Sequence, residues 1–192
     1  MNRDVKNILL VGVGGQGTIL ASKILSDALV GLGFDVKMSE IHGMSQRGGN
    51  VSTQIRYGDK VYSPVVGIGE ADVIVAFEKM EALRWVEYLR EGGRMVVNDF
   101  EIPSAPILMG KAEYPGNIPE TLSAEIDVLM IGATDAAAEL GNTRVMNTVL
   151  LGALAKSMDI DGVDWEQMIR RNVKKGFEDL NVKAFRRGYE LS

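Results

Sequence analysis

An apolar segment that runs into closely spaced glycines sets the strongest limit on how this chain folds. Residues Asn7–Val13 are short and apolar, as in a strand buried on both faces. Residues 12–17 read GVGGQG, and Thr18–Leu32 then place apolar side chains at helical spacing. Gly33 follows that helix as a C-terminal cap, and Phe34–Ser39 have the composition of a second strand. A strand, a glycine loop, a helix and a strand in this order predict parallel strands joined by a right-handed crossover.

The rest of the chain predicts more elements of the same layered kind. Further strands are expected at 72–77, 94–98 and 127–131, with a short one at 107–109. Two strands at 51–57 and 60–63, joined at Gly58-Asp59, predict an antiparallel hairpin after a loop at 40–49. Helices are expected at 79–90, closed by Gly92-Gly93, and from residue 133 onward, with Asn142 as one N-cap.

A chain of 192 residues fits one domain. We therefore expect a single α/β domain over residues 1–192. Its sheet is Rossmann-like and mostly parallel, with an inserted antiparallel hairpin and a helical C-terminal region.

The composition restricts the chemistry that this chain performs by itself. It contains no cysteine, and His42 is its one histidine. A disulfide, a thiolate nucleophile, a Cys-ligated zinc or iron–sulfur centre and a multi-His metal site are therefore excluded. The net charge of −5 argues against a nucleic-acid partner. Without a signal-peptide pattern or an apolar run of roughly 20 residues, we expect a cytoplasmic protein with no membrane partner.

The first glycine loop allows two interpretations. Gly12, Gly14 and Gly17 satisfy G-x-G-x-x-G between a predicted strand and a predicted helix. In a dinucleotide-binding protein these glycines give a tight turn, a close approach to phosphate and close helix packing, and Glu40 would hold ribose hydroxyls. A free-standing NAD- or FAD-binding protein is thus one hypothesis. The other is that any doubly wound domain needs glycines at this turn, and the polar loop after Glu40 favours this second interpretation.

A second loop, residues 40–49, reads EIHGMSQRGG. The loops after the first and second strands of an open parallel sheet emerge at the same carboxyl edge, where ligands bind. Arg47 suits a phosphate or a carboxylate through its planar fork. Alternatively, Arg47 pairs with Glu40 and only orders the loop. His42 is more readily a hydrogen-bonded loop residue than a catalytic base.

Together the two loops resemble the gamma-type domain of the 2-oxoacid:ferredoxin oxidoreductases, and in particular the small beta-subunit type that acts on indolepyruvate. The string His42–Gly49 is far more specific than the glycine motif. Further matches extend almost to the C-terminus and include Ser63-Pro64, Phe77-Glu78, Tyr114-Pro115, Gly141-Asn142, Asn147, 150–154 and 181–185.

The resemblance implies a subunit of a heteromeric enzyme that is not active alone. In that family a large (alpha) partner subunit holds thiamine diphosphate and 4Fe–4S clusters, decarboxylates a 2-oxoacid and reduces ferredoxin. Coenzyme A is the co-substrate that receives the acyl group. The resemblance implies indolepyruvate as the substrate, with a gamma subunit for pyruvate, 2-oxoglutarate or a branched-chain oxoacid as the alternative. No cofactor is expected on this chain alone.

The resemblance and the two loops predict a site that helps to receive coenzyme A, with no catalytic residue and no metal ligand. Its expected residues are Gly12, Gly14, Gly15, Gln16, Gly17, Glu40, Gln46, Arg47 and Gly48. The alternative within the family is that residues 40–49 dock the partner subunit. The C-terminal region is basic, either as a solvated surface or as a surface that meets an acidic partner.

Overall fold

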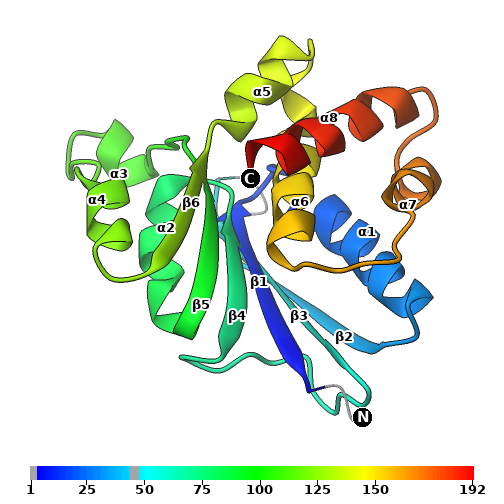
Figure 1. Ribbon diagram of the computed structural model, residues 1–192. Helices are drawn as coiled ribbons and strands as arrows, with labels where there is room; N and C mark the ends of the chain where they lie inside the picture. Colours follow the sequence, from blue (N-terminus) through cyan, green and yellow to red (C-terminus); the bar gives the residue numbers. More distant parts are fainter. Residues whose placement is uncertain (1–3, 44–47) are drawn as a thin grey trace.

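The computed structural model describes residues 4–43 and 48–192. They form an α/β domain around a six-stranded sheet of order β2-β3-β1-β4-β5-β6, as the sequence predicts (Figure 1). The strands are β1 (Lys6–Val13), β2 (Asp35–His42), β3 (Asn50–Gly58), β4 (Ala71–Ala76), β5 (Leu89–Asn98) and β6 (Asp127–Ile131). The helices are α1 (Thr18–Gly31), α2 (Lys79–Trp85), α3 (Ala105–Leu108), α4 (Ile118–Ser123), α5 (Ala133–Glu139), α6 (Met146–Ser157), α7 (Trp165–Asn172) and α8 (Glu178–Leu191), with 3-10 turns η1 (Val86–Tyr88) and η2 (Thr143–Val145).

Helices cover both faces of the sheet. On one face α1, α6, α7 and α8 pack over a core that includes Leu25, Val75 and Leu150, and on the other α2 and α4 cover Ile74 and Met95 (Figure 1). The central strands are buried on both sides, which explains their continuous apolar sequences. Among the described residues, no helix has the length and apolar character needed to cross a membrane.

Parallel pairing joins β1 to β4, β4 to β5 and β5 to β6, whereas β3 runs antiparallel to both β1 and β2. The inserted antiparallel hairpin is therefore present, but it consists of β2 and β3. The predicted pairing of 51–57 with 60–63 is wrong, because both edges of β3 are already occupied. Part of the predicted loop at 40–49 is strand too, since β2 continues to His42.

The segment after β3 lies along the sheet without forming a strand, and side chains satisfy its backbone instead. Asp35 Oδ2 accepts a hydrogen bond from the Val61 N–H at 2.9 Å, and Gln54 Oε1 accepts one from the Val66 N–H at 2.7 Å. Val66 is buried and covers the sheet on this side. This explains how a segment with alternating apolar residues closes the core without a strand partner.

Two other predicted elements differ in the structure. The helix predicted at 79–90 ends at Trp85, and Gly92-Gly93 lie inside β5, at an irregularity in its pairing with β4. The short strand predicted at 107–109 is wrong, because α3 occupies 105–108 with Pro106 in its first turn, a favoured position for proline.

Two glycines allow α6 and α8 to cross at close range. A Cβ atom at Gly188 would lie 1.8 Å from the Val149 carbonyl oxygen, and one at Gly152 would lie 2.1 Å from the Phe185 carbonyl oxygen. Both distances are shorter than any tolerable contact, so the crossing requires glycine at both positions. This close crossing fixes α8 against α6, which begins beside the first glycine loop.

Candidate functional site

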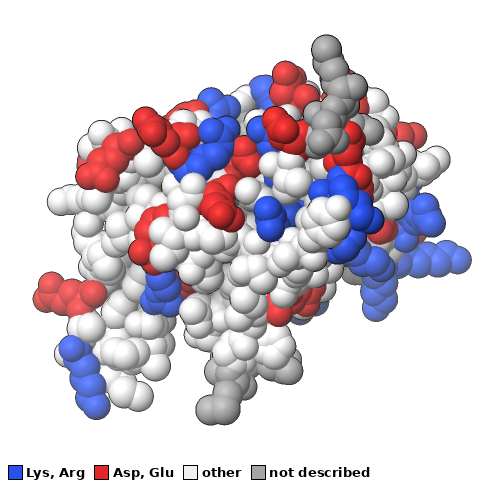
Figure 2. Space-filling model, turned by 90° about the horizontal axis from the view of Figure 1, so that it is seen from below, with Lys and Arg blue, Asp and Glu red and all other residues white. Residues whose placement is uncertain are grey.

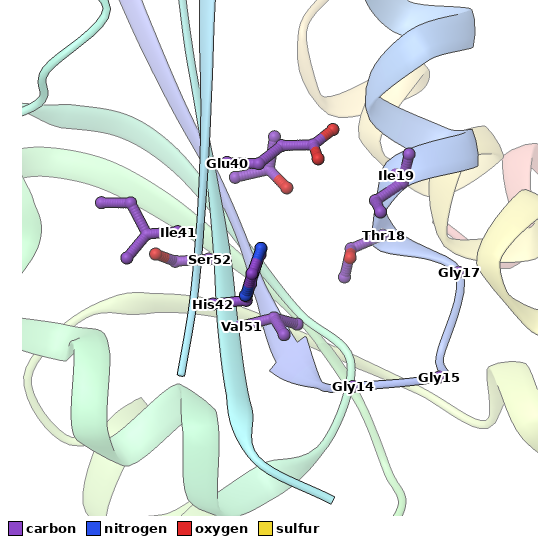
Figure 3. Close-up of a pocket in the computed structure, with 11 residues that line it drawn as sticks. Gly14, Gly15, Gly17, Thr18, Ile19, Glu40, Ile41, His42, Val51 and Ser52 are labelled. Atoms are coloured by element: carbon purple, nitrogen blue, oxygen red, sulfur yellow. The ribbon is translucent and has the colours of Figure 1, made fainter. Parts of the chain in front are cut away.

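A cavity of about 420 Å³ opens between the start of α1 and the end of the β2–β3 hairpin (Figure 3). It lies beyond the carboxyl end of β1, at the edge where open α/β sheets bind ligands. Its lining residues are Gly14, Gly15, Gly17, Thr18, Ile19, Glu40, Ile41, His42, Val51, Ser52 and Thr53. The cavity thus brings together the first glycine loop and Glu40, as the sequence predicts.

Gln16 and Gly12 shape the glycine loop from below and do not line the cavity. Gln16 Oε1 accepts a hydrogen bond from the Val13 N–H at 2.7 Å, and its Nε2 donates to the Phe77 carbonyl at 2.8 Å. The Gln16 side chain therefore ties the end of β1 to the end of β4. A Cβ atom at Gly12 would approach Gln16 Oε1 to 2.8 Å and Phe77 Cβ to 2.9 Å. Glycine at position 12 makes room for this bridge.

Gly14 continues the pairing of β1 with the chain before β3. Its N–H donates to the Gly49 carbonyl at 2.8 Å, and its carbonyl accepts from the Gly48 N–H at 3.5 Å. The Gly14 N–H is therefore not available to a phosphate in this arrangement. Gly15 has φ +106° and open space around it, so the loop turns freely at that residue.

Gly17 ends the loop in a left-handed conformation, with φ +83°. Its carbonyl accepts a hydrogen bond from Asn147 Nδ2 at 3.1 Å, and a Cβ atom at this position would lie 2.6 Å from the same nitrogen. Gly17 thus permits both the backbone turn and the contact between the loop and α6.

The start of α1 faces the cavity without a side-chain cap or an acidic residue in its first turn. The first N–H groups of a helix lack intrahelical acceptors, and the helix dipole places partial positive charge there. Thr18 and Ile19 line the cavity at this point. This wall therefore favours an anionic group.

The opposite wall consists of side chains from the hairpin. In Figure 3, Glu40 and His42 point from β2 toward α1, whereas Ile41 and Ser52 point the other way. Glu40 pairs in register with Thr53 of β3. Within the described chain, Glu40 makes no hydrogen bond or ion pair through its side chain, and a carboxylate at this position suits a ligand's hydroxyl or N–H group. His42 Nδ1 lies 3.2 Å from the Gly43 carbonyl oxygen, which accepts from it.

The structure does not test every predicted residue. Gln46 and Arg47 are outside the described residues, so the predicted Glu40–Arg47 pair is untested. Gly48 lines a neighbouring cavity of about 340 Å³ beside α2. The sequence interpretation missed the following lining residues: Thr18, Ile19, Ile41, Val51, Ser52 and Thr53. The alternation of polar and apolar residues at Glu40, Ile41 and His42 is the sequence signal that a strand extending past Ser39 would have given.

The neighbouring cavity contains a buried carboxylate pair. Glu78 caps α2 by accepting a hydrogen bond from the Glu81 N–H at 2.5 Å, and it also accepts one from the Tyr114 hydroxyl at 2.9 Å. Burial raises the pKa of the Glu81 carboxyl, and Arg84, whose Nη1 lies 2.9 Å from Glu81 Oε1, opposes this shift. Each carboxylate is thus bonded within the protein and stabilises α2 and the segment around Tyr114.

Strand order separates this site from a dinucleotide site. In the dinucleotide-binding fold the acidic residue follows the strand adjacent to β1. Here β3 lies between β1 and β2, which places Glu40 two strand spacings, roughly 10 Å, from β1. Together with the occupied Gly14 N–H, this geometry weighs against an NAD or FAD site. Across the described residues, no three His, Asp or Glu side chains are grouped to hold a metal ion.

The fold and the site define a cysteine-free α/β chain with a cavity suited to an anion, and comparisons with known proteins place it in a family. Residues 7–191 match the model of the pyruvate ferredoxin/flavodoxin oxidoreductase family. The chain therefore belongs to that family, and the resemblance read from its two loops is confirmed.

Individual relatives are subunits of oxidoreductases and of a synthase. The chain is 39% identical over 192 residues to indolepyruvate oxidoreductase subunit IorB of Pyrococcus horikoshii, covering 97% of this chain and 95% of the relative. It is 31% identical over 195 residues to 2-oxoglutarate synthase subunit KorC of Methanothermobacter thermautotrophicus, covering 97% and 94%. The crystal structure of pyruvate oxidoreductase subunit PORC from Thermotoga maritima superposes with a TM-score of 0.72 at 26% identity, covering 97% and 96%.

Proposed function

We propose that this chain is the small, cofactor-free subunit of a 2-oxoacid:ferredoxin oxidoreductase. The observation that carries the proposal is the family match over residues 7–191 to relatives that are themselves subunits. The absence of cysteine supports it, because iron–sulfur clusters need thiolate ligands from another chain. In this proposal a large alpha subunit holds thiamine diphosphate and the 4Fe–4S clusters, and ferredoxin meets the complex. The proposal includes one domain over residues 1–192 and a cytoplasmic location.

The proposed substrate is indolepyruvate or another aryl pyruvate. The greater identity to the indolepyruvate relative than to the 2-oxoglutarate relative supports this choice. The alternative is a gamma subunit for pyruvate, 2-oxoglutarate or branched-chain oxoacids. Assays of the assembled complex with these oxoacids test the choice. We expect kcat/KM to be highest with indolepyruvate, and a clear preference for another oxoacid would replace it.

We further propose that the cavity at the start of α1 receives the phosphate-bearing part of coenzyme A. The uncapped N–H groups at Thr18 and Ile19 suit a phosphate, and the Glu40 carboxylate opposite them, which has no partner among the described residues, suits a ligand hydroxyl. Gly14, Gly15 and Gly17 keep this wall free of side chains, while Gly12 and Gln16 hold the loop in place. Gln46, Arg47 and Gly48 stay in the proposal as residues predicted from the sequence.

A charge placed at the start of α1 tests the coenzyme A site. Ile19 lines the cavity with 59% of its surface exposed, and Val30, near the other end of α1, is 58% exposed. Ile19→Glu puts a carboxylate beside the proposed phosphate position, whereas Val30→Glu is a matched control away from it. We expect Ile19→Glu to raise the KM for coenzyme A of the assembled enzyme about tenfold, the equivalent of ~1.4 kcal/mol. An unchanged KM would remove this cavity from coenzyme A binding.

Arg47→Ala separates the two roles that the sequence leaves open for the second loop. If Arg47 contacts coenzyme A, the variant raises the KM for coenzyme A and still co-purifies with the large subunit. If Arg47 lies in the subunit interface, the variant loses co-purification. Thermal melting with NAD, FAD and coenzyme A tests the remaining hypothesis of a free-standing dinucleotide-binding protein, and a shift with NAD alone would favour it.

A further inference from the structure

A shallow cavity of about 330 Å³ on the other side of the α1 N-terminus is lined by cations. Arg144 of η2 and Lys174, which follows α7, both line it, together with Leu20 of α1. Among the described residues, no Asp or Glu side chain lines this cavity. We define the cationic pocket by its lining residues, which are Leu20, Asn142, Arg144, Val173, Lys174, Phe177 and Asn181.

The cations of this pocket differ from other basic side chains of the C-terminal region. Arg170 pairs with Glu166 and Asp179, and Arg186 pairs with Glu166. By contrast, Arg144 and Lys174 are exposed and form no ion pair within the described residues, and the same holds for Arg171 and Lys175, which are close to Lys174 in the sequence. A protein of net charge −5 therefore keeps a local group of uncompensated positive charge at this place.

The surroundings extend the positive surface along α1. Lys23 is exposed and without an ion pair in the described chain, and it lies one turn from Leu20 on α1. The positive surface ends at Asp27, a carboxylate farther along α1 that accepts a hydrogen bond from Asn172 of α7 at 2.9 Å. On the face seen from below, Figure 2 shows Lys and Arg side chains gathered at the right-hand edge, with some Asp and Glu side chains among them.

An aromatic side chain provides an apolar surface within the cationic pocket. Phe177 lines it and is 40% exposed, although its backbone carbonyl is fixed by Asn181 Nδ2 at 2.9 Å. Partly exposed aromatic residues held by a rigid backbone and surrounded by charges are typical anchors of protein interfaces.

We propose that the cationic pocket docks an acidic segment of the large partner subunit. The inference rests on the proposed function for the existence of that partner and adds where and by what chemistry it binds. Charge complementarity selects an acidic segment, because the unpaired cations attract carboxylates and repel basic surfaces. Docking here also places the partner beside α1, whose first residues line the candidate coenzyme A cavity.

The exposed cations and the apolar Phe177 side chain of the pocket together favour a protein segment over a small anion. Asn142 Oδ1 already accepts from the Arg144 N–H at 3.0 Å, and Asn181 Oδ1 accepts from the Thr148 hydroxyl at 2.7 Å. Both amide oxygens are therefore occupied, and exposed cations surround a shallow apolar floor. A segment with several carboxylates and an apolar side chain would pair with the cations and also pack against the apolar floor.

Charge reversal tests the inference with matched controls. Lys174→Glu reverses one unpaired cation of the pocket, and Lys111→Glu reverses an exposed, unpaired cation of the described chain beyond α3 on the opposite side of the sheet. Phe177→Ala removes the aromatic side chain, and Phe100→Ala, at 38% exposure, is its control. We expect Lys174→Glu and Phe177→Ala to weaken binding to the purified large subunit at least tenfold, with unchanged melting temperatures, while the controls bind as the wild type does.

The outcomes separate this inference from the proposed function. If the wild-type chain does not bind the large subunit, the proposed function fails. If it binds and the pocket variants bind equally well, only the inference fails. Binding of inorganic pyrophosphate that Lys174→Glu abolishes, without an effect on the large subunit, would assign the pocket to a small anion and overturn the inference.

Carbodiimide cross-linking of the wild-type complex supplies a test that needs no variant. The reagent joins a lysine amine to a carboxylate only where the two are in contact. We expect mass spectrometry to find Lys174 or Lys175 joined to Asp or Glu of the large subunit. Cross-links that involve other lysines of this chain but neither of these two would contradict the proposed position.

Discussion

Gly17 meets two separate requirements at the start of α1. Its left-handed φ of +83° is a conformation that other residues adopt only with strain, and Asn147 fills the space where a Cβ atom would stand. The residue therefore joins the conformation of the loop to the position of α6.

Gly33 separates these two requirements, because it has φ +82° and open space around it. We expect Gly33→Ala to lower the free energy of unfolding by about 1–2 kcal/mol through backbone strain alone. Gly17→Ala carries the same strain and also displaces Asn147, so its loss is larger by about 1 kcal/mol. Chemical denaturation of both variants measures the difference. Equal losses would show that the contact with Asn147 contributes nothing.

The glycines of the first loop were predictable from their spacing, since a strand followed at once by a helix needs a tight turn. The hydrogen bonds of the Gln16 side chain and of the Gly14 N–H were not predictable, because their partners, Phe77 and Gly49, are distant in the sequence. Local sequence signals therefore located the candidate site, whereas long-range pairing decided which of its donors are free.

At the scale of elements, the crossing of α6 and α8 depends on glycine. Alanine in place of glycine within a helix normally adds stability, by up to about 1 kcal/mol. Gly188→Ala reverses this expectation, because its methyl group would overlap the Val149 carbonyl oxygen of α6. We expect a loss of about 3 kcal/mol or more in the free energy of unfolding.

Gly31→Ala is the control for this prediction, because Gly31 lies in α1 with no atom near its absent Cβ. We expect it to be neutral or stabilising by up to ~1 kcal/mol in the same denaturation experiment. A Gly188→Ala variant as stable as the wild type would mean that the helices separate without cost.

The segment after β3 is held to β2 through Asp35. Hydrogen bonding to Lys37 and to the Val61 N–H lowers the pKa of the Asp35 carboxyl. A carboxyl whose pKa is lower in the folded state adds stability above its unfolded pKa of about 3.9 and loses it as the pH falls through the folded pKa. We expect Asp35→Asn to be less stable than the wild type near neutral pH and equally stable in strong acid. Urea unfolding across pH tests this, and a gap independent of pH would contradict it.

The sequence predicts elements well where local pattern decides and poorly where pairing decides. The buried strands β1 and β4 and the apolar helix α6 follow from composition, because their burial requires apolar residues on most sides. The edge strand β6 is only partly buried, and its short apolar run still identifies it. The pairing of β3 with β2 does not follow from composition. Residues 34–39 and 60–63 both have strand composition, and only the complete sheet selects β2 as the partner. The end of α2 was missed for a related reason, because β5 draws Leu89 into the sheet beside Ala71.

At the scale of the whole molecule, charge and composition describe a subunit. A net charge of −5 is combined with an unpaired cationic pocket beside α1, and a cavity suited to an anion lies next to it. The chain has no cysteine to hold the redox centres that electron transfer to ferredoxin requires. The two binding surfaces and the absence of cysteine are explained together if a partner subunit supplies the reactive groups and this chain supplies only places to bind.

Reconstitution tests most directly whether this chain is a cofactor-free subunit that is inactive without its large partner. The purified chain, the purified large subunit and their mixture are each assayed for coenzyme A-dependent reduction of ferredoxin with indolepyruvate. We expect no turnover by this chain alone and coenzyme A-dependent turnover when the large subunit is added. Turnover by the isolated chain, or its purification with a flavin or metal of its own, would contradict the account.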